Sequence, residues 1–347
     1  MSDVARRSTS KQRKNIDQKG KQMNLPSNIS LSMQVWLAND TYDHNTDPLT
    51  ISATGLLNSI KQIILTGRVK TEPGLANVNV LAASRIGTAI HDSVENAWTG
   101  DVVPLLRKVG LPESIANRIV VNATPERLKE LSDPIPVYLE QRAHKKVGNY
   151  TISGKYDIVF NGKLEDVKST STYTYVNKTN NDKFAMQGSI YRWLSPDIIT
   201  DNNMLIQYVF TDWKAMQAKT DQSYPPCKVM AVELPLLSIA DTQRYIVDKL
   251  NAMEQYWNSS EEDIPPCTEE ELWRSAPMHK YYKNPAKKAR STKNFAVHGD
   301  AISRLAADGG VGEVVTVPGE VKRCLYCDAF DVCKQKDNYI ADGSLKM

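Results

Sequence analysis

The sequence lacks the features that mark membrane proteins, exported proteins and nucleotide-driven motors. It has no run of about 18 apolar residues, so we expect no membrane-spanning helix. The apolar segment of a secretory signal is missing, which favours a cytoplasmic protein. There is no Gly-x-x-x-x-Gly-Lys-Ser/Thr phosphate-binding loop, which argues against an ATP-driven helicase. The cysteines number five, and an odd count without an export signal argues against a disulfide framework.

The chain is long enough for one large core plus an appended subdomain, since 41% of its 347 residues are hydrophobic. Its formal net charge is +3, but the charge is unevenly spread. Residues 1–25 hold seven basic side chains against Asp3 and Asp17, with few apolar residues between them. Such a segment cannot bury a core, so we expect a flexible basic arm.

Asn161-Gly162 predicts a tight β-hairpin between strands at 151–160 and 163–169. Counting outward from a two-residue loop places Asp157 opposite Asp166, on one face of the sheet. Two carboxylates about 5 Å apart repel each other unless a cation lies between them. Oxygen ligands of this kind suit Mg²⁺ or Mn²⁺.

The same register places Lys155 opposite Lys168 on the face of the two aspartates, and Glu165 on the other face. An ammonium beside a bound divalent cation suits phosphodiester hydrolysis, in which negative charge builds on the phosphate. The alternative is a solvated surface on which the two lysines and two aspartates only neutralise one another.

Four separate motifs resemble the PD-(D/E)XK nucleases, in particular their RecB-like branch. Gly154-Lys155-Tyr156-Asp157 and the segment 166–170 match the paired core motifs. Residues 86–95, with His91, match an upstream helix, and Gln187 with Tyr191 matches a downstream Gln-x-x-x-Tyr helix. Residues 51–57, followed by Arg68, are similar to the opening helix of phage-encoded and CRISPR-adaptation nucleases of this branch.

The resemblance implies roles for these residues. Asp157, Asp166, the backbone carbonyl of Val167 and the His91 imidazole would hold Mg²⁺ or Mn²⁺. Glu95, one helical turn after His91, would orient that histidine or a metal-bound water. Lys168 would either position or deprotonate the attacking water, or stabilise the charged phosphate. Gln187 and Tyr191 would share one helix face, with ordinary amphipathic packing as the alternative.

Periodicity predicts an α/β fold whose mixed central sheet is flanked by helices, the order expected of the restriction-endonuclease-like core. Helices are predicted near residues 52–66, 83–98, 114–131, 183–194 and 238–258, and strands near 135–144, 149–160, 163–169, 203–212 and 228–236. We expect a basic arm at 1–25, a nuclease domain at 26–258 and a basic, cysteine-containing metal-binding subdomain at 259–347.

The segment 280–293 holds six cations and two tyrosines without an acidic residue. Such a mixture suits contact with phosphates and stacking on unpaired bases, and a solvated basic loop is the alternative. The six cations are Lys280, Lys283, Lys287, Lys288, Arg290 and Lys293.

The pattern Cys324-x2-Cys327-x5-Cys333 is similar to the iron-sulfur end of some RecB-like nucleases. The CRISPR-associated members have their first cysteine ligand upstream of the position of His91, but this sequence has no cysteine there. Cys267 is therefore the preferred fourth ligand, and Cys227 is the reserve. We expect a 4Fe-4S cluster whose four ligands cross-link the C-terminal subdomain. The alternatives are structural zinc, held by four thiolates or with His279 or His298, and free thiols.

The resemblance implies a Mg²⁺- or Mn²⁺-dependent deoxyribonuclease, an exonuclease acting on DNA ends in phage or mobile-element replication and recombination. DNA would be its substrate, and a helicase, a single-strand-binding protein or a recombination protein its partner. A structure-specific endonuclease and a non-catalytic DNA-binding subunit are the alternatives.

Overall fold

The computed structural model describes residues 28–39, 47–69 and 78–346. The predicted arm at 1–25 lies outside these residues. The chain divides into two compact units, Met1–His44 with Pro73–Val94, and Asn45–Glu72 with Glu95–Met347. The first unit contains α1 (Leu31–Ala38) and most of α4 (Val78–Thr99), where the buried Arg85 guanidinium donates to the Leu37 carbonyl at 3.1 Å.

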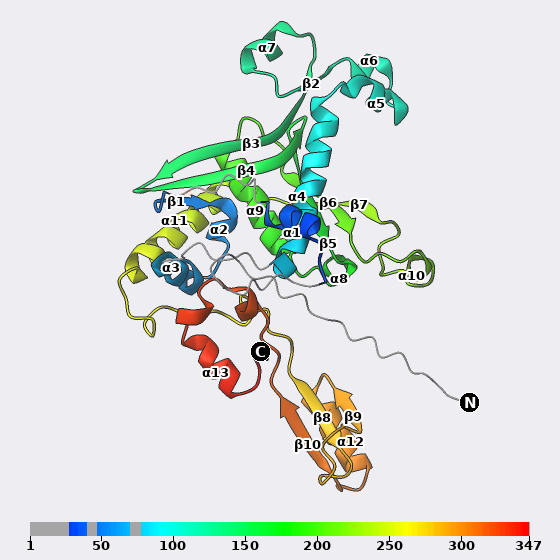
Figure 1. Cartoon of the computed structure of the whole chain (residues 1–347), viewed down its shortest axis with the longest axis vertical. Coiled ribbons are helices and arrows are strands. Elements are labelled where there is room, and N and C mark those ends of the chain that lie inside the picture. Colours follow the sequence, from blue (N-terminus) through cyan, green and yellow to red (C-terminus); the bar gives the residue numbers. More distant parts are fainter. Residues whose placement is uncertain (1–27, 40–46, 70–77, 347) are drawn as a thin grey trace, which may run out of the picture. The chain divides into compact units, whose positions relative to one another are not determined.

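The described residues of the second unit form a mixed sheet of seven strands, in the order β2-β3-β4-β5-β6-β7 with β1 also paired to β4. Pairs β2–β3, β5–β6 and β1–β4 are parallel and the others antiparallel. In Figure 1, β3 and β4 make a long curled ribbon. The strands are β1 (Thr50–Ser52), β2 (Ile119–Val121), β3 (Ile135–Val147), β4 (Tyr150–Phe160), β5 (Lys163–Thr170), β6 (Asn203–Phe210) and β7 (Val229–Pro235).

One edge of β4 is shared by two different strands. β1 pairs with residues 151–153, and β5 pairs with residues 158–160 in the predicted hairpin register, with Ile158 opposite Glu165. Asn161 and Gly162 both have positive φ, at 47° and 87°, as a tight Asn-Gly turn requires. Between the two partners, none of the described strands pairs with this edge at residues 154–157.

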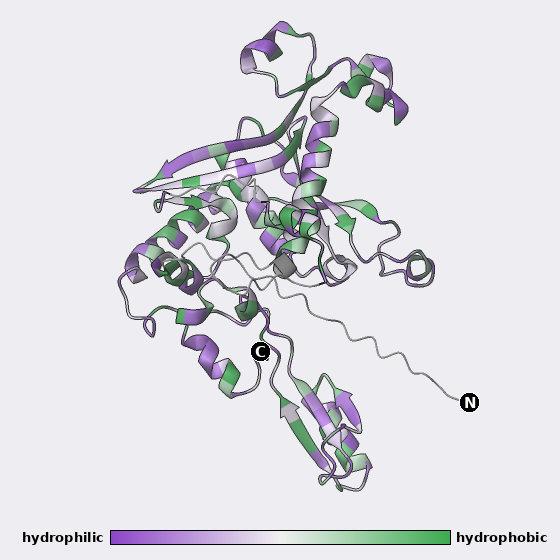
Figure 2. Cartoon of the chain, viewed as in Figure 1, coloured by the Kyte–Doolittle hydropathy of each residue, from purple (hydrophilic) through white to green (hydrophobic). Residues whose placement is uncertain are grey.

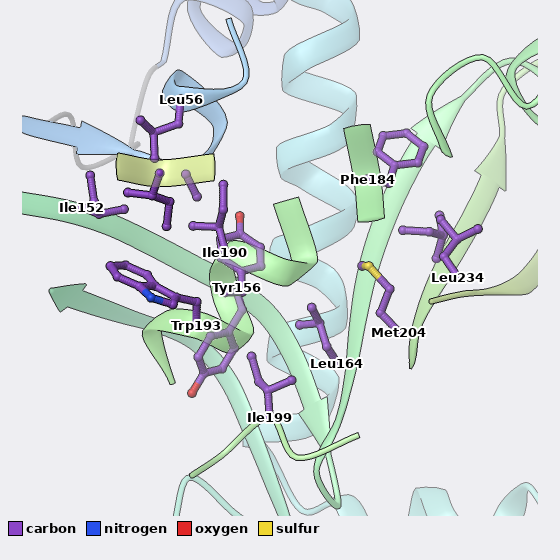
Figure 3. Close-up of a cluster of buried hydrophobic side chains, with 14 of the residues drawn as sticks. Leu56, Ile152, Tyr156, Leu164, Phe184, Ile190, Trp193, Ile199, Met204 and Leu234 are labelled. Carbon is purple, nitrogen blue, oxygen red and sulfur yellow. The ribbon is translucent and has the colours of Figure 1, made fainter. Parts of the chain in front are cut away.

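Helices of the second unit pack against the sheet around one large core. Trp193 of α9, Tyr156 of β4 and Met204 of β6 are almost fully buried in it, as Figure 3 shows. The helices of this unit that precede residue 257 are α2 (Ala53–Leu56), α3 (Ile60–Arg68), α5 (Val102–Lys108), α6 (Glu113–Ala116), α7 (Pro125–Glu130), α8 (Thr172–Asn177), α9 (Asn181–Leu194), α10 (Ala215–Thr220) and α11 (Ile239–Tyr256).

Hydrophobic and hydrophilic residues alternate along these helices and strands (Figure 2), as expected of elements with one buried and one exposed side. Among the described residues, no helix is both long and apolar enough to cross a membrane. The prediction of a mixed sheet flanked by helices is confirmed.

Two predicted helices have different boundaries. The segment 114–131 is not one helix but α6, β2 and α7, because Ile119-Val120-Val121 pairs with β3 and Asn122 adopts a positive φ of 50°. Thr124 then caps a new helix that starts at Pro125. The predicted helix 52–66 is interrupted before Ser59, whose hydroxyl accepts from the Gln62 N–H and starts α3.

A second sheet that the sequence analysis did not predict has the order β10-β8-β9, and residues 283–292 of the basic segment connect β8 to β9. Tyr281 is fully buried in it, and its hydroxyl donates to Asp308 at 2.8 Å. The C-terminal elements are β8 (Met278–Tyr282), β9 (Lys293–Phe295), α12 (His298–Ala307), β10 (Glu313–Val317), the 3₁₀ helices η1 (Arg323–Tyr326) and η2 (Phe330–Val332), and α13 (Gln335–Ala341).

Candidate active site and cysteine cavity

Asp166 of β5 is the most buried carboxylate of the predicted site, with 1% of its surface exposed. Oδ1 accepts from the Gln187 amide at 3.3 Å, and Oδ2 lies 2.5 Å from the Lys168 ammonium. Apart from this ion pair, Oδ2 is buried without a hydrogen bond of normal geometry among the described residues. A buried carboxylate oxygen in this condition is a good ligand for a cation.

Lys168 lies two residues after Asp166, so both side chains are on the same face of β5. Burial opposes the charge on Lys168, yet the negative charges of Asp166 and Asp157 outweigh it, and the pKa of the ammonium is raised above its ordinary value. Lys168 is therefore a charged donor at neutral pH. It cannot remove a proton from water in this state.

Asp157 lies where β4 and β5 separate. The strand pairing stops at Ile158 and Glu165, so the expected pairing of Asp157 with Asp166 is not part of the ladder. Instead, the Asp157 Oδ2 accepts from the Val167 N–H at 2.8 Å. The Asp157 side chain thus links β4 to β5 beyond the end of their backbone pairing. Its carboxylate lies next to the backbone of Val167.

Glu140 of β3 is a member of this cluster that the sequence analysis missed. One of its oxygens lies within 4.8 Å of an Asp157 oxygen, and Oε2 forms an ion pair with Lys155 at 2.6 Å. Its φ of +50° is unusual for a residue with a side chain, and the β3–β4 ladder skips this position. Backbone strain of this kind is found at functional sites, where the surroundings hold it in place.

A signal for Glu140 was present in the sequence. Gly148-Asn149 forms a second two-residue loop, with Val147 opposite Tyr150. Counting outward from Gly148-Asn149, by the same method as for Asn161-Gly162, places Glu140 opposite Asp157. Lys155 therefore bonds to Glu140, and the expected pairing with Lys168 does not form because the β4–β5 ladder ends before it.

Gln187 and Tyr191 lie on one face of α9, as four-residue spacing predicts. The Gln187 amide donates to Asp166 and also to the Tyr191 hydroxyl, the latter at 2.8 Å. Gly154 allows α9 to approach this closely, because a Cβ there would come within 2.8 Å of the Tyr191 ring and 2.6 Å of Leu194. The close packing of α9 against β4 thus explains why the motif has a glycine at this position.

Glu165 differs from its neighbour Asp166 in every described contact. It accepts from the Gln207 amide at 3.0 Å and has no described contact with Lys168 or Gln187. Burial raises the pKa of Glu165, and the bond from Gln207 partly offsets the shift. The two adjacent carboxylates therefore have separate environments.

His91 and Glu95 both lie in α4, but in different units. His91 is half-buried in the first unit, and its role as a metal ligand stays a prediction. Glu95 belongs to the second unit. Burial lowers the pKa of Lys155, but the bond to Glu140 and the charges of Glu140 and Glu95 reverse this effect and raise it overall.

Four cysteines line one small cavity next to α3, namely Cys267, Cys324, Cys327 and Cys333. Burial raises the pKa of Cys324 to about 11, and the other three cysteines add to the rise. Within the described chain, no three of the four sulfurs come within 4.8 Å of one another. Tetrahedral zinc thiolates would be closer, about 3.8 Å apart for zinc–sulfur bonds of about 2.3 Å.

The other candidate ligands lie elsewhere. Cys227 is exposed, and its thiol donates to the Val229 carbonyl at 3.1 Å. His279 is in the second sheet, with Nδ1 at 2.9 Å from the Thr316 hydroxyl and its ring centroid 5.0 Å from that of His298. Neither these histidines nor Cys227 lines the cavity of the four cysteines.

The predicted DNA-binding cations lie on β8, on β9 and in the connection between them. Lys280 is half-buried and the other five are exposed, namely Lys283, Lys287, Lys288, Arg290 and Lys293. Lys288 forms an ion pair with Glu313 at 2.6 Å. Their role in binding DNA stays a prediction.

The sequence matches no family model and no curated protein. Among solved structures, a protein described as SSO0001 is similar at a TM-score of 0.35 and 16% identity, over 65% of this chain and 82% of that one. A phage-related exonuclease from Haemophilus somnus 129PT is similar at a TM-score of 0.28 and 13% identity, over 60% of this chain and 93% of that one. Both TM-scores are below 0.5, so neither likeness decides the function of this chain.

Proposed function

We propose that this chain is a metal-dependent nuclease of the RecB-like PD-(D/E)XK type that hydrolyses phosphodiester bonds in DNA. The observation that carries the proposal is the buried Asp166 carboxylate, bonded to both Gln187 and Lys168. Burying an ion pair costs free energy unless function or further bonds offset it. A surface pair that only neutralises charge would not need such burial.

The residues present fit a hard divalent cation. Asp157, Asp166 and Glu140 supply carboxylate oxygens, and the sequence resemblance adds His91 and the Val167 carbonyl as ligands. Mg²⁺ or Mn²⁺ bound there would polarise a phosphate oxygen and lower the pKa of a bound water. Glu140 enters this proposal from the structure alone.

The other polar residues would orient these ligands and the substrate. Gln187 fixes the rotation of the Asp166 carboxylate, and Tyr191 accepts the second amide hydrogen of Gln187. Lys168, charged beside Asp166, would donate to a phosphate oxygen as negative charge develops on it. We therefore assign it electrostatic stabilisation in preference to general-base catalysis.

We propose exonuclease action on DNA ends, as the sequence resemblance implies. Incubating the purified protein with end-labelled linear DNA and with covalently closed circular DNA, each with Mg²⁺, Mn²⁺ or a chelator, tests this. We expect metal-dependent loss of linear DNA only. Cleavage of the circle would identify an endonuclease, and no cleavage with any metal would overturn the proposal in favour of a DNA-binding subunit.

We propose a 4Fe-4S cluster at the four cysteines in preference to zinc. The preference follows the sequence resemblance of the Cys324-x2-Cys327-x5-Cys333 pattern, and it is supported by the finding that no three of the four sulfurs lie as close together as the ligands of one tetrahedral ion. Ile64 and Leu65 of α3 are buried against Cys327 and Cys333. The cluster would thus tie the C-terminal segment to α3.

A further inference from the structure

The start of α3 forms one wall of the cavity that the four cysteines line. Ser59, Lys61 and Gln62 all contribute to the lining. The buried Lys61 ammonium forms an ion pair with Glu261 at 2.7 Å, and the Arg323 guanidinium donates to the Gln62 side-chain oxygen at 3.2 Å. Polar bonds therefore join the start of α3 to the segment that carries the cysteines.

Ser59 makes two contacts with one hydroxyl group, and only 6% of its surface is exposed. Its Oγ accepts from the Gln62 N–H at 3.0 Å and so caps α3. The same Oγ lies 3.1 Å from the Cys267 Sγ. Because the helix cap uses a lone pair of the oxygen, the hydroxyl hydrogen remains available for the sulfur.

Metal ligation decides the direction of the bond between Ser59 and Cys267. Either group can donate while Cys267 is a thiol, since both then carry a hydrogen. A cysteine that binds a metal ion is a thiolate and has no hydrogen to donate. In a metal-loaded site, the Ser59 hydroxyl is therefore the donor and the Cys267 sulfur is the acceptor.

The backbone of Cys267 is held by a second side chain, that of Gln335 in α13. Its Oε1 accepts from the Cys267 N–H at 2.9 Å, and its Nε2 donates to the Cys267 carbonyl at 3.1 Å. The same Nε2 donates to the Tyr339 hydroxyl at 2.7 Å, which fixes the amide in turn. Cys267 is distant in sequence from the other three cysteines, yet its backbone and its sulfur are both anchored beside them.

The charges around the cavity have both signs and do not single out one sulfur. Glu271 lines the cavity together with Lys336, and the Lys336 ammonium is paired with Asp337 at 2.8 Å. The contact from Ser59 is more specific. Within the part of the chain that the structure describes, no other side chain forms a hydrogen bond with a sulfur of the four cysteines.

We propose that Ser59 is a positioning residue of the cysteine site, whose hydroxyl donates to the Cys267 sulfur, raises the reduction potential of the cluster and slows its loss of iron. The inference rests on the 4Fe-4S cluster proposed above. A donor draws electron density from a ligand sulfur and thereby favours the more negative, reduced cluster. It also holds the ligand in the orientation that binds iron.

Three variants separate this role from the capping of α3. Ser59→Gly removes the donor while glycine remains a tolerated N-cap residue, and Ser59→Thr keeps a hydroxyl at the same position. Ser238→Gly is the matched control. Ser238 caps α11 by accepting from the Asp241 N–H at 3.0 Å, and it has no described contact with a cysteine.

Two measurements on anaerobically purified, iron-loaded full-length protein test the role of Ser59, namely a reductive titration and the rate of iron release to an excess of chelator. We expect Ser59→Gly to lower the equilibrium constant for reduction about threefold or more, which is about 28 mV for a one-electron couple. Iron release should become about threefold faster or more. Ser59→Thr and Ser238→Gly should match wild type in both measurements.

Equal values for Ser59→Gly and Ser238→Gly would overturn the inference and leave the cluster in place. If the cluster resists reduction, the rate of iron release decides alone. Failure of Ser59→Gly to hold iron supports the role if Ser59→Thr holds it, and loss of iron from both variants contradicts it, because threonine keeps the donor. Wild-type protein that contains no iron would refute the cluster itself, before any variant is compared.

Discussion

The Lys168 ammonium lies 2.5 Å from an Asp166 oxygen while 2% of the Asp166 side chain is exposed. One consequence follows for the metal-free protein. Although burial opposes the rise, the charges of Asp166 and Asp157 raise the pKa of Lys168, so Lys168 holds its proton more tightly than a free lysine. A divalent cation at Asp166 would compete with the lysine for the same charge.

The ion pair predicts a specific dependence of stability on pH. Lys168 has a raised pKa in the folded state, so its contribution is fully present below the unfolded value of about 10.4 and is lost as pH rises through the folded value. In metal-free protein, the difference in unfolding free energy between wild type and Lys168→Met should stay constant from about pH 7 to 10 and change only above that. Chemical denaturation across this range measures it. A difference that changed near pH 7 would contradict the raised pKa.

Glu140 provides a test in which stability and activity separate. Glycine accepts a positive φ freely, so Glu140→Gly should relieve backbone strain of about 1 kcal/mol, set against the loss of the ion pair with Lys155. We expect an unfolding midpoint equal to or above that of wild type, with nuclease activity reduced about tenfold or more. Glu140→Gln, which keeps the strain, should lose activity without the gain in stability. Full activity in both variants would exclude Glu140 from the metal site.

The cysteines predict a difference between two serine variants. Anaerobically purified wild type should be brown and contain about four iron atoms per chain. Cys267→Ser should lose iron and destabilise the C-terminal segment, whereas Cys227→Ser, outside the cavity, should keep both. Iron and zinc analysis with thermal unfolding measures the outcome. A colourless wild-type protein that contains one zinc per chain would show that the four cysteines hold structural zinc and no iron-sulfur cluster.

Local signals predicted the parts of the fold and site that depend on short stretches of chain. Asn161-Gly162 set the β4–β5 register, and four-residue spacing placed Gln187 and Tyr191 on one helix face. Glu140 was missed because its position depends on a second hairpin and on a backbone distortion that no pattern encodes. The segment 114–131 was read as a helix because pairing with β3, a contact distant in sequence, decides the conformation of Ile119-Val120-Val121.

The C-terminal sheet was missed for a related reason. The cations between Lys280 and Lys293 dominate the composition and suggest a loop, while Tyr281 is the residue that anchors the strand pairing in the interior. A cleft lined by Lys183, Lys249 and Trp273 was also beyond sequence reasoning. Its lining residues come from five separate parts of the chain, so only the folded structure brings them together.

Single-turnover cleavage by Asp166→Asn and Glu165→Gln, with saturating DNA and Mg²⁺ or Mn²⁺, tests the central claim most directly. The substitutions preserve side-chain size and are one residue apart, but only Asp166 contacts Lys168 and Gln187. We predict a loss of about a hundredfold or more in the rate of Asp166→Asn with DNA binding retained, and a change of less than about threefold for Glu165→Gln. Equal rates for the two folded variants, or cleavage that persists in a chelator, would contradict the account.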